Sequence, residues 1–208
     1  MAKQWKTLIK SLAATSACLG MLACGSSNNN SGNNGNTTTD SDIQASTVQI
    51  QATTQLAVQN AIVTSGLSLK LESVDESPPC ATGGTSHVTG DVSAGSPNSF
   101  NLDVDLTGCT GLTGAVNATG TFAFDGAGYS TDYTITKQGG DNQCDLTFNN
   151  LEISINIPDF TVPTTNDTTI TGGVDGDCTT GSASCIYHDL MISQGPNGGS
   201  QSGSIDCE

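Results

Sequence analysis

The sequence predicts a mainly β protein, either an antiparallel curved sheet or a two-layer sandwich, with one N-terminal amphipathic helix packed on it. Apolar Phe100, Leu102, Val104 and Leu106 alternate with polar residues, which is the period of a strand with one face in a core. Glycine-rich turn sequences separate several such segments. Strand and helix patterns do not alternate along the chain, which argues against a nucleotide-binding fold built of βαβ units.

Other segments with apolar residues at strand spacing complete the sheet. In chain order they are Leu67 to Glu72, Leu112 to Phe124, Tyr129 to Ile135, Leu146 to Ile157, Ile170 to Val174 and Ile186 to Ile192. The alternation changes phase between Phe148 and Leu151. Since a slip of one residue reverses the face of every side chain, Asn149-Asn150 is predicted to form a bulge or turn.

The segment from Ile43 to Thr64 contains neither glycine nor proline, and its apolar residues gather near one helical face. Asp42 is suited to cap the start of a helix, and Gly66 is suited to stop it. We therefore expect a helix over residues 43–65 and a β domain over residues 66–208. The helix contains neither lysine nor arginine, so packing on the sheet is favoured over binding to a membrane surface.

The N-terminus has the layout of an export signal. Three lysines (Lys3, Lys6 and Lys10) precede an uncharged apolar run from Leu12 to Ala23, which is too short to span a bilayer. Residues 1–23 are thus predicted to be a signal peptide and are left out of the fold.

The end of that run, Met21-Leu22-Ala23-Cys24, resembles the lipobox of bacterial lipoproteins. The resemblance implies cleavage before Cys24, which then carries a thioether-linked diacylglycerol and an amide-linked acyl chain such as palmitate. It also implies a place in the cell envelope, and Gly25 after the cysteine favours the outer membrane, with the domain facing the periplasm or the cell surface. Cys18 is the rival lipidation site, and an ordinary secreted protein is the rival interpretation.

Residues 24–42 are expected to be the lipidated cysteine followed by a tether, because the segment is Ser, Asn, Gly and Thr with almost no apolar residue. Removing the signal peptide leaves Lys70 and Lys137 against 20 acidic residues, a net charge of −18 compared with −15 for the whole chain. Such a chain offers no basic surface for nucleic acid. The expected partners are the membrane, through the lipid, and an envelope protein, glycan or lipid.

Six further cysteines form an even set in an exported chain, which favours disulfides over a metal site: Cys80, Cys109, Cys144, Cys178, Cys185 and Cys207. We expect Cys80 to pair with Cys109 and leave the other four to form two bonds among themselves. The absence of a Cys-x-x-Cys pair argues against zinc and redox chemistry.

No catalytic constellation stands out, so the chain is not expected to be an enzyme. His188 alternates with Ile186 and Leu190 and is expected to face inward; a hydrolase site built on His188 or His87 is the weakest alternative, since no Gly-x-Ser-x-Gly elbow supports it. No cofactor is expected beyond the lipid. Four aspartates are weak candidates for a calcium site: Asp103, Asp105, Asp175 and Asp177. Tyr129, Tyr133 and Tyr187 are expected to pack in the core or at its rim.

Taken with Leu106-Thr107-Gly108-Cys109 and the segment Cys144 to Asn150, this composition resembles uncharacterised Thr/Gly-rich β-sheet lipoproteins of myxobacteria and related Gram-negative groups. The resemblance implies no particular activity. The function expected is that of a structural or surface-interaction lipoprotein. The alternative is a carrier that holds a lipid or another hydrophobic ligand between helix and sheet.

Overall fold

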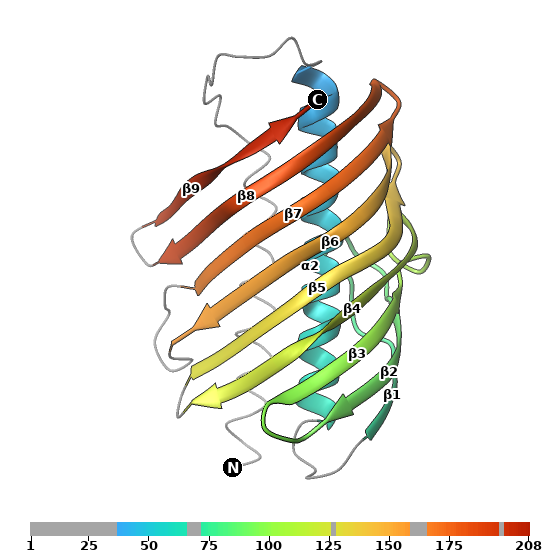
Figure 1. Ribbon diagram of the computed structural model, residues 1–208. Helices are drawn as coiled ribbons and strands as arrows, with labels where there is room; N and C mark the ends of the chain where they lie inside the picture. Colours follow the sequence, from blue (N-terminus) through green and yellow to red (C-terminus); the bar gives the residue numbers. More distant parts are fainter. Residues whose placement is uncertain (1–36, 66–71, 126–127, 159–165, 196–197) are drawn as a thin grey trace.

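The computed structural model describes residues 37–65, 72–125, 128–158, 166–195 and 198–208, which form one helix and nine strands (Figure 1). The helix, α2, spans Thr37–Ser65. The strands are β1 (Glu72–Glu76), β2 (His87–Ser93), β3 (Asn98–Asp105), β4 (Leu112–Asp125), β5 (Gly128–Asp141), β6 (Cys144–Ile157), β7 (Asn166–Cys178), β8 (Gly181–Gly195) and β9 (Gly198–Cys207).

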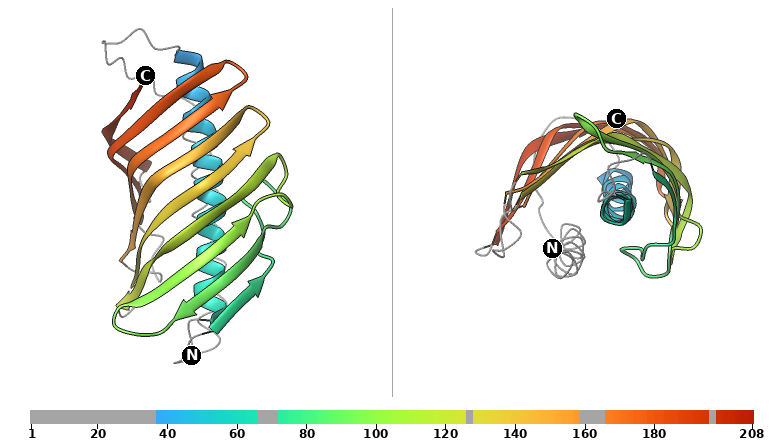
Figure 2. Two further views of the ribbon diagram at one scale, coloured as in Figure 1. Left: turned by 45° about the vertical axis from the view of Figure 1, so that its right-hand side comes forward. Right: turned by 90° about the horizontal axis from the view of Figure 1, so that it is seen from below.

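The strands make one antiparallel sheet in which each pairs with the next in sequence, from β1 at one edge to β9 at the other. The sheet bends into an arc, and α2 lies inside it (Figure 2). The helix crosses the strands: Asp42 near its start accepts a bond from Thr180 between β7 and β8, whereas Thr53 lies against Ala81 between β1 and β2. The curved-sheet prediction is confirmed, and the sandwich alternative is not.

Alternation along the strands separates the two faces of the sheet. In β6 the buried and exposed positions alternate almost throughout, and every buried position from Leu151 to Ile157 is apolar. The concave face therefore carries the core, and α2 packs on it. Burying one such side chain stabilises the fold by about 1.5–3 kcal/mol.

Two glycines let α2 approach the concave face closely. A Cβ at Gly176 would lie 2.5 Å from Cγ1 of Ile43, and one at Gly139 would lie 3.4 Å from Cδ1 of Ile50. Ile43 and Ile50 are fully buried and lie two helical turns apart on one side of α2. Because these positions in β5 and β7 are glycines, there is space for two isoleucines of the helix to pack against the sheet.

Bulges occur where the alternation of inward and outward side chains changes phase. The register of β6 against β7 shifts between Asn149 and Glu152, and Asn150 has a φ of 54°, which confirms the bulge predicted there. A second shift lies between His188 and Met191 of β8. It was not predicted, and it makes two expectations wrong: Ile186 is 44 % exposed, and His188 faces outward with its side chain 51 % exposed. Tyr187 takes the inward position instead and is 2 % exposed.

The helix begins six residues earlier than the predicted boundary, at Thr37 rather than Ile43. Residues 37–42 therefore belong to α2 and not to the tether, and Asp42 lies inside the helix instead of capping it. Asp40 in the first turn favours this extension, because an acidic side chain complements the positive end of the helix dipole. Burial of Thr39 adds to it.

Three disulfides pair all six cysteines of the β domain. Cys80–Cys109, as predicted, joins the loop after β1 to the loop after β3, while Cys144–Cys178 and Cys185–Cys207 link residues directly opposite each other on neighbouring strands. The Cα atoms of the two cross-strand pairs are 4.0 and 4.1 Å apart. Each closed loop stabilises the fold by about 2–4 kcal/mol.

Several expectations concern segments outside the described residues: the signal peptide, Cys24, the rest of the tether to residue 36, Gly66, and the apolar run from Leu67. Within the described part of the chain, α2 is not apolar enough to cross a membrane.

Candidate interaction surface on the convex face

The convex face of the sheet is a polar surface to which most of the strands contribute. Its outward positions on β3 to β8 carry hydroxyl, amide and carboxylate groups that are exposed or half-exposed, and we define the convex face by them: Asn101, Asp103, Asn117, Thr119, Thr134, Gln138, Asp145, Thr147, Asn149, Glu152, Ser154, Thr171, Asp175, Asp177, Ser182 and Ser184. Short side chains at period two produce this face for the same reason that apolar ones produce the concave face.

One hydrogen-bonded network on this face spans β3, β4 and β5. Asn117 donates through Nδ2 to Oδ1 of Asn101 at 2.9 Å and to Oδ1 of Asp103 at 3.1 Å. Thr119 donates to Oδ1 of Asn101 at 3.0 Å. Lys137 forms an ion pair with Asp103. The Lys137 ammonium, followed by Asn117, holds the pKa of Asp103 below its usual value, and both members of the ion pair are about half exposed, so the pair contributes little to stability.

A second network lies beside a shallow hollow of about 490 Å³ over β4 to β7. Asp175 accepts hydrogen bonds from Ser184 at 2.6 Å and from Asn149 at 2.6 Å, which lower the pKa of its carboxyl. Asp177 accepts one from Ser182 at 2.8 Å. Asp145 of β6 lies directly opposite Asp177 and lines the same hollow.

The four calcium candidates do not converge. Asp103 and Asp105 lie on β3 and Asp175 and Asp177 on β7, with three strands between them. Asp105 accepts bonds from the amide and hydroxyl of its near neighbour Thr107, which lower the pKa of its carboxyl. Each of the four carboxylates accepts a hydrogen bond from a nearby donor.

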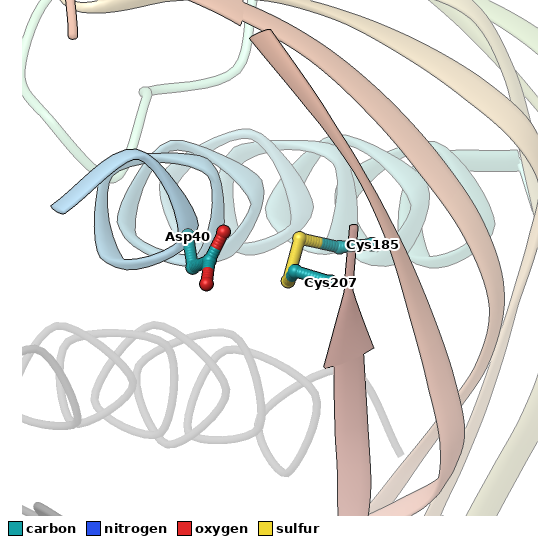
Figure 3. A group of neighbouring side chains, drawn as sticks. All are labelled: Asp40, Cys185 and Cys207. Carbon is teal, nitrogen blue, oxygen red and sulfur yellow. A yellow bond between two sulfur atoms is a disulfide. The ribbon is translucent and has the colours of Figure 1, made fainter. Parts of the chain in front are cut away.

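Across the described residues, the side chains close enough to share a metal ion are those of Asp40, Cys185 and Cys207. Figure 3 shows the Asp40 carboxylate at the start of α2 beside the two sulfur atoms, which are bonded to each other. A disulfide supplies no thiolate ligands. This cluster instead brings the start of the helix to the end of β9.

Both histidines lie on the surface beside an acidic partner from the neighbouring edge strand. His87 of β2 is 2.8 Å from Asp75 of β1, and His188 of β8 is 3.2 Å from Asp206 of β9. Each imidazole thus has a carboxylate beside it, one pair at each end of the sheet. An imidazole and a carboxylate are two of the three groups of the hydrolase site considered above.

Sequence reasoning missed a polar seam between α2 and the concave face, which we define as Thr47, Gln51, Tyr133 and Tyr187. All four side chains are buried. Burial raises the pKa of Tyr133, and that of Tyr187 to about 12, while Gln51 and Thr47 respectively lie near the two hydroxyls and oppose the rise. The Gln51 amide also donates to Gln55 at 3.0 Å. The recurrence of glutamine at positions 51, 55 and 59, one helical turn apart, was the available signal.

Comparisons with known proteins return no match: no protein-family model, no curated protein and no solved structure is similar enough to this chain to place it.

Proposed function

We propose that this chain is an exported lipoprotein of the bacterial envelope, anchored by acyl chains on Cys24, which acts by contact through the convex face of its β domain. The observation that carries the proposal is the combination of the lipobox-like Met21-Leu22-Ala23-Cys24 with three disulfides farther along the chain. Disulfides persist in oxidising compartments outside the cytoplasm, and the lipobox is read during export to such a compartment.

In this proposal the acyl chains enter the bilayer, and the folded domain stays outside it at the membrane surface. Two or three acyl chains anchor a protein durably, because each buried methylene contributes about 0.8 kcal/mol. With the concave face occupied by α2, the convex face is the broad surface left for a partner. Its hydroxyls, amides and carboxylates suit a hydrated envelope partner, either glycan or protein, or one with positive charge.

Membrane fractionation of three versions of the protein tests the anchor. We expect wild type and the matched control Cys18→Ala to remain with the membranes after a high-salt wash and to enter the detergent phase. Cys24→Ala is expected to lose the acyl mass and to appear in the soluble fraction, or to keep its signal peptide uncleaved.

The opposite pattern, with Cys18→Ala released and Cys24→Ala still acylated, would place the lipid on Cys18. Wild type recovered without acyl chains in the soluble fraction would contradict lipid anchoring altogether.

A carrier for a hydrophobic ligand is the second candidate, and one observation favours it. Thr47 and Gln51 of α2 lie near Tyr187 and Tyr133 of the concave face, so part of the contact between helix and sheet is polar. A helix held in this way separates at lower cost than an apolar one. In that case a fluorescent fatty acid would bind with saturable affinity, and a disulfide linking α2 to β5 would abolish binding; no saturable binding would exclude the carrier.

A further inference from the structure

The two edges of the sheet differ in length and charge. Edge strand β1 has five residues, three of them acidic: Glu72, Asp75 and Glu76. Edge strand β9 has ten residues, of which only Asp206 is charged. In a chain with 20 acidic residues and five basic ones, β9 is therefore a long uncharged edge. It also lacks the lysine and proline residues by which edge strands commonly discourage pairing.

The C-terminal part of β9 is held against β8 by a disulfide and by backbone hydrogen bonds. Cys207, the penultimate residue, is bonded to Cys185 of β8. Beyond it, Ser184 and Glu208 exchange both backbone hydrogen bonds, at 2.9 and 3.0 Å. This part of β9 is therefore ordered before any partner arrives, so pairing costs little further conformational entropy.

The Ser184–Glu208 pair also fixes which backbone groups face outward. In an antiparallel ladder, hydrogen-bonded pairs alternate with non-hydrogen-bonded ones. Cys207 and Ile205 are therefore non-hydrogen-bonded partners of β8 and direct their N–H and C=O groups away from the sheet. Gln201 lies opposite the buried Ile192 as Ile205 lies opposite the buried Tyr187, so Gln201 and Gly199 share this phase, whereas Gly203 lies at the bulge with a φ of 94°. The neighbouring serines Ser200 and Ser202 are exposed and short, so a second strand can approach.

We propose that β9 pairs with β9 of a second copy of this chain, antiparallel and around a two-fold axis at Gly203, so that two sheets join into one. This register pairs the outward backbone groups on either side of the axis, since Gln201 meets Ile205 and Gly199 meets Cys207. Such an interface is isologous, with the same patch contributed by both copies.

The positions of the charged side chains favour a second copy as the partner, and they favour this register of the two strands. Asp206 of each strand falls opposite Ser200 of the other, and Glu208 falls opposite Gly198, so no carboxylate meets another across the axis. The Ser200 hydroxyl can donate to the Asp206 carboxylate on the same face of the joined sheet. Two β1 edges would instead bring three acidic residues from each side together. The contact is small, so the dimer is expected to be weak and to tighten in salt, which screens the repulsion between two acidic molecules.

Sedimentation of the purified protein over a range of concentrations tests this pairing. Wild type is expected to pass from monomer to dimer in the micromolar range, at lower concentration as salt rises. Ser200→Asp places an acid against Asp206 twice in each dimer and should weaken dimerisation at least tenfold. Ser200→Lys should strengthen it severalfold. Gln138→Asp and Gln138→Lys, which make the same charge changes at an exposed site in the middle of the sheet, should change it less than twofold at high salt.

Gln201→Pro supplies an independent test, because it removes an outward N–H at an exposed position while leaving the bonds of β9 to β8 intact. It should abolish the dimer without lowering the unfolding temperature substantially. A wild-type protein that stays monomeric throughout, or a dimer that Ser200→Asp and Gln201→Pro both leave unchanged, would overturn the proposal. Neither result bears on acylation of Cys24.

Discussion

The concave and convex faces of the sheet are made by the same strands, yet alternate residues give them opposite characters. On β5, Ile135 is fully buried beneath α2, whereas Thr134, its neighbour in sequence, is half-exposed on the convex face. The concave face holds the apolar core, and the convex face holds hydrogen-bonded hydroxyls, amides and carboxylates. The difference shows that the apolar core and the polar surface are assigned to alternate positions, so each can be tested by changing one residue at a time.

The largest expected effect is the loss of folding stability at high pH, which acts through the concave face. The three tyrosines of the chain are buried there, and burial raises the pKa of each. Tyrosines in the unfolded chain ionise near pH 10, so the stability present below that pH is lost above it, by about 4 kcal/mol per pH unit for three groups. Tyrosinate absorbance and circular dichroism should therefore change together in one cooperative step. Tyrosinate forming near pH 10 while the sheet persists would show that the tyrosines are not buried.

The next largest effect is the loss of a core side chain. Ile135→Ala should lower the free energy of unfolding by about 2–5 kcal/mol, since it removes buried methyl groups and leaves a cavity. Thr134→Ala, one residue away on the other face, should change it by no more than about 0.5 kcal/mol. Urea denaturation measures both. Equal losses for the two variants would mean that the faces are not divided as described.

A glycine pair on β7 gives a smaller effect. Gly176→Ala places a Cβ against Ile43 of α2 and should cost about 1–3 kcal/mol through overpacking. Gly173→Ala is the matched control, because its Cβ would lie 3.5 Å from the nearest atom, at ordinary contact distance. The same urea denaturation compares them. A Gly176→Ala protein as stable as wild type would indicate that α2 does not seat on β7.

Low pH should have the smallest effect, and it acts on the convex face. Hydrogen bonds lower the pKa of Asp175, so its contribution is present above the unfolded value near 3.9 and is lost as pH falls through the lower folded value. Because the group is exposed, the loss is under about 1 kcal/mol. Between pH 5 and pH 3, wild type should lose slightly more stability than Asp175→Asn. A larger loss in the variant would assign the acid sensitivity to another group.

The sequence contained enough to predict the curved sheet, the helix and the Asn149-Asn150 bulge, because each depends on local spacing of apolar residues. It did not contain an evident sign of the bulge after His188, where Asp189 adopts a φ of 45°. Ile186 and Tyr187 are both apolar enough to face a core, so the alternation could be read in either phase. The early start of α2 was missed because Thr37 to Asp42 are polar, and their helix depends on tertiary burial of Thr39 rather than on an apolar pattern.

The convex face was foreseen only in part. The outward direction of Asp103 follows from strand period and is confirmed, but its link to Lys137 joins residues 34 positions apart and depends on the register of β3, β4 and β5. The pairing of Cys144 with Cys178 and of Cys185 with Cys207 likewise follows from which strands are neighbours, which spacing along the chain left open.

The central claim is that a lipid on Cys24 displays this domain in the envelope. The mass of the N-terminal peptide of wild-type protein purified from membranes tests it most directly. Our account predicts a chain that begins at Cys24 and carries a diacylglyceryl group and an amide-linked acyl chain, with no free thiols among the six remaining cysteines. A chain that begins elsewhere, or one that begins at Cys24 without acyl groups, would contradict it.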